Sequence, residues 1–420
     1  MNKILLNKKF LTSLIIPLII LFLIPGPFLP DAIVSISGIS FLFFILKKND
    51  FKYLKNKFFI FFLIFYTYSV VLSLFSGEIL SVKSSLTFIR FGLFACFIVF
   101  LINTNREKVF SYLYIFFITI FLILIADGFY QYFSGKNLIG LKLYKNVRVS
   151  SFFGEELILG SYISRLFPLF FALFVIKKKI HQYEKYLVAI IFVCLDILIY
   201  ISGERTAFFF LNLSTITIIV LIKKFQLFRL ITFLIGLSLI FFISINNSNI
   251  TKRMFSEINE QVIIPENNER KIFTPIHDSH IRTAFNIFLD RPLTGYGPKM
   301  FRVMCEKKEF QVGIKPCSTH PHNFYVQLLA ETGIIGFSFL TISFLYILIC
   351  LIRQFKSVIF FEKKRPFSDY QVCLLSALFI TVWPFSPNGN FFNNWLATVY
   401  TIPLGFYIHS IYYGLKGEKN

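Results

Sequence analysis

Long apolar runs alternate with short polar links along most of the chain. Most runs approach the length of about 20 apolar residues that a helix needs to cross a bilayer. This pattern predicts that residues 1–420 form a single integral membrane domain, an all-α polytopic membrane protein with about 12 transmembrane helices. The predicted spans are residues 10–25, 29–46, 58–76, 84–103, 109–133, 157–176, 186–202, 206–222, 229–245, 329–352, 369–387 and 395–415.

Basic residues are concentrated in every second link. Because positive charge is retained in the cytoplasm, these links are predicted to be cytoplasmic, which also places the N- and C-termini there. Residues 25–31, 76–83 and 384–394 are poor in basic residues and are predicted to lie outside. The basic links are residues 47–57, 106–108, 177–185, 223–229, 353–365 and 416–419.

Composition and charge support the membrane class. The 420 residues are 56% hydrophobic and 15% charged, whereas soluble domains contain about 25% charged residues. The net charge is +21, but the Lys and Arg residues gather between the apolar runs. Membrane topology therefore explains the charge, and no nucleic-acid partner is needed.

Two predicted outer segments keep basic residues against this rule. Residues 134–156 contain three lysines and Arg148. Residues 246–328, the long loop before the third-last span, carry many charges of both signs. We expect this outer (periplasmic) loop to be structured, with a helix around residues 278–290, and to carry the catalytic segment.

Cys305 and Cys317 share the long loop, and an outer location would let a disulfide between them persist. Such a bridge would hold the segment that follows it; the alternative is two free thiols. The other four cysteines lie in apolar runs and are predicted to be buried: Cys96, Cys194, Cys350 and Cys373.

The segment around His322 is the most informative part of the chain. Pro321 suits the first turn of a helix, which would place His322 in that turn. The helix dipole there disfavours a charged imidazole, and a neutral imidazole is the form that a general base requires. Gly333 and Gly336 would permit close packing where the helix enters the membrane. Alternatively, His320 and His322 are polar residues that only cap the helix.

Three arginines are predicted near the outer boundary. Arg205 lies in a very short link between two spans, Arg282 lies on the loop helix, and Arg148 precedes a span. Arginine stays protonated and binds phosphate bidentately, so their convergence would indicate a phosphate-bearing substrate; the alternative is a set of headgroup anchors. Ionisable residues within the spans are functional candidates by default, and we single out Arg90, Asp127, Arg165 and Asp196. We interpret Arg90 and Arg165 as ion-pair or polar-cavity residues.

A metal site is the competing interpretation of the histidines. His277, His280, His320 and His322 could supply imidazoles, and Asp278 a carboxylate. Their spacing matches no tight zinc signature, and the nearby arginines would repel a cation. We therefore expect no metal.

These motifs resemble the signature of the O-antigen ligase and polymerase superfamily of bacterial membrane proteins. The resemblance rests on His322-Asn323, nine further residues, and Gly333-Ile-Ile-Gly336. Arg205 after a Ser-Gly turn also matches. Three further segments contribute: Arg282 with Pro292-Leu-Thr-Gly-Tyr-Gly297, Arg148-Val-Ser-Ser-Phe-Phe-Gly, and the early Pro-Gly-Pro-Phe-Leu-Pro.

The resemblance implies a C-type glycosyltransferase fold that acts on undecaprenyl-diphosphate-linked glycan at the periplasmic face of the bacterial inner (cytoplasmic) membrane. It implies that His322 deprotonates the acceptor hydroxyl, and that arginines hold the diphosphate and stabilise it as it leaves. Direct attack would invert the anomeric centre. Neither metal nor nucleotide cofactor is implied. The diphosphate-binding set is Arg148, Arg205 and Arg282, and the supporting candidates are His320, Asn323, Glu331, Gly333 and Gly336.

Several functions share this signature. A ligase transfers the glycan to lipid A–core, a polymerase transfers it to another lipid-linked repeat, and a third branch transfers it to protein. We favour the ligase. A transporter for the same lipid-linked glycan is the alternative from another class, but it would place its key charges near the bilayer midplane, whereas those found here lie at the outer boundary.

Overall fold

The computed structural model describes residues 11–256 and 273–414, and within these ranges every regular element is a helix. Two isolated β-bridges join residues 136 to 142 and 144 to 148. The helices are α2 (Ile15–Phe22), α3 (Phe28–Lys48), η1 (Phe51–Tyr53), α4 (Lys57–Ser76), α5 (Ile79–Ser134), η2 (Ser151–Glu156), α6 (Leu159–Val175), α7 (Gln182–Ile201), α8 (Arg205–Leu221), α9 (Gln226–Asn246), α10 (Ser248–Thr251), η3 (Lys252–Ser256), α11 (Pro275–Asp290), α12 (Phe301–Met304), η5 (Lys308–Phe310), α13 (Phe324–Ile359), α14 (Asp369–Thr381) and α15 (Asn394–Tyr412).

Each predicted apolar run coincides with a helix, and α5 contains two of the runs on either side of a bend at Asn105. Among the described residues, five helices are long and apolar enough to cross a membrane, namely α3, α4, α5, α9 and α13. Three shorter helices, α6, α8 and α14, are also apolar. The all-helical class is therefore as predicted, while the count of about 12 spans stays a prediction.

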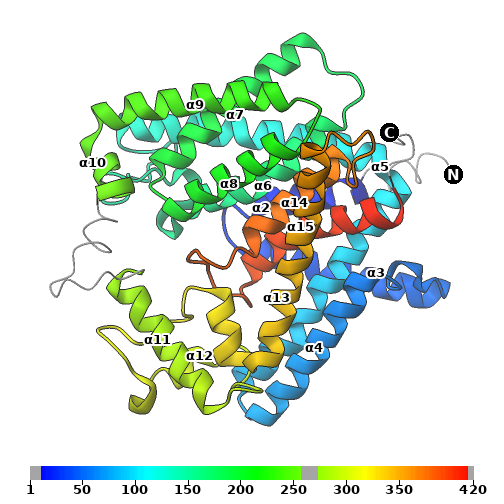
Figure 1. The fold of residues 1–420 in the computed structure, drawn as a ribbon, viewed down its shortest axis with the longest axis vertical. Coiled ribbons are helices and arrows are strands. Elements are labelled where there is room, and N and C mark those ends of the chain that lie inside the picture. Colours follow the sequence, from blue (N-terminus) through cyan, green and yellow to red (C-terminus); the bar gives the residue numbers. More distant parts are fainter. Residues whose placement is uncertain (1–10, 257–272, 415–420) are drawn as a thin grey trace.

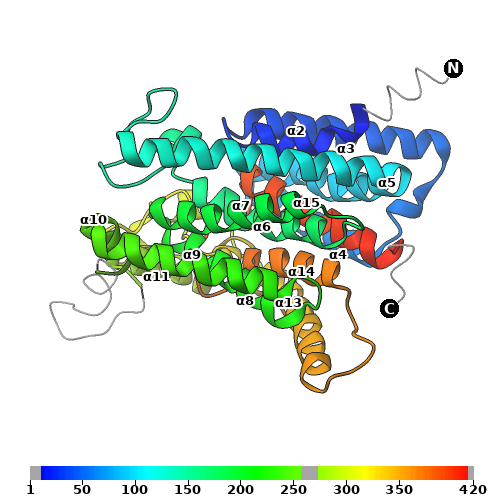
Figure 2. The same cartoon turned by 90° about the horizontal axis from the view of Figure 1, so that it is seen from above.

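The helices form a bundle with a separate group at one end. In Figure 1, α7 and α9 run side by side along one edge, while α11 and α12 lie apart from them, near the start of α13. In both views α10 lies at the opposite end from the last turn of α15, and the α3–α4 and α13–α14 links lie toward that last turn (Figure 2).

The sequence interpretation of Arg229 as part of a cytoplasmic link was wrong. This residue lies within α9 and is fully buried. Its guanidinium forms a bidentate pair with Asp196 of α7, with both N–O distances 2.9 Å, and also donates to Thr215 of α8 at 2.9 Å. Arg229 therefore joins three helices internally. The pair also accounts for Asp196, because each buried charge neutralises the other.

Buried polar residues of α5 anchor the segment between α5 and α6. Asp127 accepts hydrogen bonds from the Leu138 amide at 2.9 Å and from the Ser151 hydroxyl at 2.5 Å. Gln131 accepts from the Ser150 and Ser151 amides at 2.9 and 2.7 Å. Asp127 thus has a structural role, which is to fix the segment that carries Arg148.

Helix α13 is broken at Gly333, where φ is 61°. The break admits the chain after α11: the Ile334 amide donates to the Pro292 carbonyl at 2.9 Å, and the Gly297 amide donates to the Glu331 carbonyl at 2.7 Å. A Cβ at Gly333 would lie 2.2 Å from the Leu293 carbonyl oxygen. The glycine is therefore needed for the approach of this loop, whereas helix packing was the reason expected from sequence.

Candidate active site

A cavity of about 1250 Å³ lies where the loops at one end of the bundle meet. It is lined by the α2–α3, α7–α8 and α14–α15 links, by η2, α6 and η3, and by the loop segments around α11, α12 and His322. Six basic side chains from the described residues line it: Arg148, Arg165, Arg205, Arg253, Lys299 and Arg302. Its composition suits an anionic ligand.

His322 lines this cavity from the residue pair that precedes α13. The sequence placed it in the first helical turn, but α13 begins at Phe324, and His322 has a left-handed φ of 57°. Asn323 is the N-cap, because its side chain accepts from the Tyr325 and Val326 amides at 2.9 and 3.1 Å. Pro321 therefore precedes the helix instead of starting it.

The backbone around His322 is tied to the α14–α15 link. The Asn388 amide donates to the His322 carbonyl at 2.7 Å, and the Asn323 side-chain amide donates to the Pro384 carbonyl at 2.7 Å. These bonds cross from one segment of the cavity wall to another. They fix the imidazole at the position where it faces the cavity.

Three other histidines surround His322. Its ring centroid lies 4.2 Å from that of His320, 5.2 Å from that of His277 and 5.3 Å from that of His280. Burial, followed by the three neighbouring histidines, lowers the pKa of His322 to about 3. The imidazole is therefore neutral near pH 7, for reasons of burial and neighbours and not because of a helix end.

His320 is held beside His322. Its Nδ1 shares a hydrogen bond of 2.9 Å with the Thr319 hydroxyl, while its Nε2 is buried without a hydrogen-bond partner. Burial is the main cause that lowers the pKa of His320 to about 4. His320 is therefore a second neutral imidazole in the lining of the cavity.

Arg148 and Arg205 meet at the α7–α8 link, as the sequence suggested. Arg148 Nε donates to the Ser202 carbonyl at 3.0 Å, and Gly203 (φ +68°) makes room, because a Cβ there would lie 2.9 Å from Arg148 Cγ. Arg205 Nε donates to the Arg253 carbonyl at 2.8 Å, which draws η3 to the same wall.

Arg165 was interpreted from sequence as an ion-pair or polar-cavity residue, and it lines this cavity. It is 4% exposed and donates to Asn388 Oδ1 at 3.0 Å, but its Nε and second terminal nitrogen have no hydrogen-bond partner. An anion in the cavity could accept hydrogen bonds from these two nitrogens of the buried Arg165 guanidinium.

Glu204 was missed by the sequence interpretation. Its carboxylate accepts from the Gly160 and Ser161 amides at 2.7 and 3.0 Å, and so joins the start of α6 to the α7–α8 link. Burial raises the pKa of Glu204 to about 7, while Arg148 and Arg165 act in the opposite direction. Its position directly before Arg205 was the available signal.

Lys299 and Arg302 were also missed, although they lie in the charged loop that the sequence singled out. Glu331, which is fully buried, accepts from the Lys299 and Phe301 amides at 2.8 and 3.2 Å and from Gln327 at 3.0 Å. The carboxylate of Glu331 thus fixes the segment that carries both cations. Glu331, a supporting candidate from the sequence, therefore has a structural role in positioning Lys299 and Arg302.

The structure does not bring Arg282 to the cavity. Its side chain is 63% exposed, and its nearest ion partner is Asp278 at 3.8 Å, one turn earlier on α11. The residue of α11 that lines the cavity is His277. Five residues at about 100° each put the two side chains about 140° apart around the helix, so both cannot face the same cavity. The role suggested for Arg282 by sequence stays a prediction.

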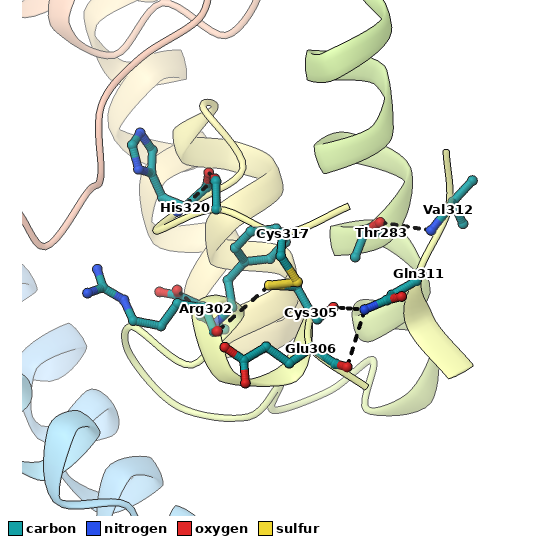
Figure 3. The surroundings of a disulfide bond; sticks show 11 residues. Thr283, Arg302, Cys305, Glu306, Gln311, Val312, Cys317 and His320 are labelled. Carbon is teal, nitrogen blue, oxygen red and sulfur yellow. Dashed lines mark hydrogen bonds between the residues drawn. A yellow bond between two sulfur atoms is a disulfide. The ribbon is translucent and has the colours of Figure 1, made fainter. Parts of the chain in front are cut away.

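Cys305 and Cys317 form a disulfide, which connects the end of α12 to the segment leading to His322. In Figure 3 the side chains of Arg302 and His320 extend away from this disulfide toward the same side. Arg302 also donates to the Thr319 carbonyl at 3.2 Å. Of the free cysteines, Cys194 is only partly buried, while the others are buried: Cys96, Cys350 and Cys373.

Within residues 11–256 and 273–414, no group of three or more His, Cys, Asp or Glu side chains has the arrangement of a metal site.

Gly336 lies against the Thr332 side chain, whose Oγ1 would be 2.0 Å from an added Cβ. This glycine therefore supports the local shape of α13 after its break.

Residues 188–341 match a family model described as O-antigen ligase. The matched region begins in α7 and ends in α13, so that it contains Arg205, Arg302 and His322. A search of curated proteins found no match. The match supports the O-antigen ligase and polymerase superfamily that the motifs indicated. Together with the candidate spans, it supports a multi-pass membrane protein with a ligase or polymerase type of function.

Proposed function

We propose that this protein is a metal-independent, inverting glycan transferase of the O-antigen ligase and polymerase superfamily. In this proposal it moves a glycan from undecaprenyl diphosphate to lipid A–core, at the periplasmic face of the bacterial inner membrane. The observation that carries the proposal is a neutral histidine, His322, in a large cavity lined by six basic side chains.

In the proposed reaction, His322 accepts the proton of the acceptor hydroxyl. The hydroxyl oxygen forms a bond to the anomeric carbon as the bond from that carbon to the diphosphate oxygen breaks. The electron pair of the broken bond leaves with the undecaprenyl diphosphate, and attack from the opposite side inverts the anomeric centre. The proton on His322 then passes to solvent.

The arginines have a defined part in this reaction. Arg148 and Arg205 lie on one wall of the cavity, where they would bind the diphosphate and stabilise the charge that develops on it. A pKa of about 3 makes the free His322 a weak base. A bound diphosphate would raise this pKa, because an adjacent negative charge favours the imidazolium form. Donor binding would thereby prepare the base.

A reconstituted reaction tests the proposal. Purified protein in liposomes receives undecaprenyl-diphosphate glycan and lipid A–core, with no nucleotide, and the products are separated on a gel. Glycan on lipid A–core supports the ligase, and an unchanged yield with excess chelator supports independence from metal. A ladder growing on the undecaprenyl carrier would instead identify a polymerase with the same site. Absence of both products would contradict the proposal.

A further inference from the structure

The basic side chains of the cavity come from two separate parts of the chain. One set, Arg148, Arg165, Arg205 and Arg253, comes from the helices and links between α5 and η3. The other set, Lys299 and Arg302, comes from the segment after α11. We call them the first and the second cation set. The charges of Arg148 and Arg165 act on the pKa of Glu204, whereas Arg302 donates to the Thr319 carbonyl and its charge acts on the pKa of His320.

The second cation set is held in place from three directions. Lys299 has a left-handed φ of 62°, a conformation that bulky residues rarely adopt, and the buried Glu331 carboxylate secures it through the Lys299 amide. Arg302 is tied to the Thr319 carbonyl, which Asn390 also contacts at 3.4 Å. The disulfide fixes the next turn. A strained backbone conformation such as that of Lys299 persists only where neighbouring contacts hold it, and such residues are often found at ligand sites.

The second cation set is not neutralised by a salt bridge within the described residues. Its acidic neighbours have other partners: Glu331 binds backbone amides, and Asp31 pairs with Arg90 at 2.8 Å. Arg302 Nε is buried and has no hydrogen-bond partner. Burial is the main cause that lowers the pKa of Lys299, and repulsion from the Arg302 charge lowers it further.

The described lining of the cavity carries more positive charge than one diphosphate needs. Among the described residues, six basic side chains line it, against the two carboxylates of Glu156 and Glu204, and burial raises the pKa of Glu204 to about 7. A diphosphate diester carries two negative charges. The first cation set is the one proposed to bind the diphosphate, and the second set can then bind another anion.

We propose that Lys299 and Arg302 bind an anionic group on the acceptor, a phosphate or a carboxylate, while the first cation set binds the diphosphate of the donor. The inference rests on the proposed function. The acceptor is assigned to this set because Arg302 donates to the Thr319 carbonyl, next to His320, whose ring centroid lies 4.2 Å from that of the base, His322. The anion would then bring the acceptor hydroxyl to the imidazole, and uncharged acceptors would be poor substrates.

The test compares three acceptors that share one oligosaccharide on one uncharged lipid anchor and carry a phosphate, a carboxylate or neither group. Steady-state transfer is measured for the wild type and for Lys299→Asn and Arg302→Gln. Asparagine is chosen because it tolerates the left-handed conformation. The matched control is Lys315→Gln, since Lys315 is exposed on the same loop and does not line the cavity.

We expect the wild type to prefer one charged acceptor over the uncharged one. Each variant should raise the KM for that acceptor by about 10- to 100-fold, as expected for loss of a charge-assisted hydrogen bond. The KM for the donor and for the uncharged acceptor should stay within about two-fold. The preferred charged acceptor identifies the anion as phosphate or carboxylate.

Two results would overturn the inference. One is equal use of charged and uncharged acceptors by the wild type, a comparison that does not depend on any variant folding. The other is a rise in the donor KM in both variants with the acceptor KM unchanged, which would assign Lys299 and Arg302 to the diphosphate. No transfer by the wild type to any acceptor would contradict the proposed function itself.

Discussion

The disulfide between Cys305 and Cys317 allows a quantitative prediction. The two residues are separated by 12 positions, and the chain-entropy relation for a loop of this length gives about 3 kcal/mol at 25 °C. Removing the bridge should therefore favour opening of the 305–320 segment by about 100-fold, since 1.4 kcal/mol corresponds to about ten-fold. The segment leads to His322, so transfer should also slow.

Hydrogen exchange measures this effect without unfolding the whole protein. Amides in residues 306–320 should exchange about 100-fold faster in the Cys305→Ser/Cys317→Ser variant than in the oxidised wild type. A reducing agent should accelerate the wild type to the same rate and leave the variant unchanged. Cys194→Ser is the control, because Cys194 is a free cysteine outside the loop. Equal exchange rates in the oxidised wild type and the variant would show that the disulfide does not restrain this segment.

Three further predictions concern side chains at the cavity. The Arg205→Lys variant should insert into the membrane normally but lose most transfer activity, since an ammonium cannot form the bidentate hydrogen bonds of a guanidinium. Full activity would indicate that Arg205 only anchors the chain to lipid headgroups. Raising the pH from 6 to 8 should ionise Glu204, whose pKa is raised to about 7, so that it competes with the diphosphate for Arg148 and the donor KM rises. The same titration of Glu204→Gln should lack this rise, and an identical rise would exclude Glu204 as its cause. His277→Ala should change transfer more than Arg282→Ala, because of these two residues only His277 lines the cavity and lies against His322. The reverse order in matched transfer assays would restore the sequence assignment of Arg282.

The helix positions could be predicted from sequence because a continuous apolar run has few alternatives to a buried or membrane helix. The convergence of Arg148 and Arg205 was also within reach, since a very short link restricts where Arg205 can lie. In both cases the signal is local. The apolar character of a run is sufficient to predict its helix, and the position of Arg205 next to a helix end is sufficient to place it.

Non-local packing decided the features that could not be predicted. The face of α11 that turns toward the cavity depends on its contacts with α13, so the sequence alone could not choose His277 over Arg282. The break at Gly333 exists because the chain near Leu293 passes against it. Arg229 looked like a link charge because its partner, Asp196, lies 33 positions earlier, on another helix.

His322 is proposed as the base, and transfer by His322 variants in liposomes is the direct test of that role. His322→Ala and His322→Asn are compared with His181→Ala, because Asn tolerates the left-handed φ and His181 is exposed and does not line the cavity. Both His322 variants should insert normally and bind donor, but transfer glycan at least about 100-fold more slowly than His181→Ala. Near-wild-type transfer by either His322 variant would contradict it.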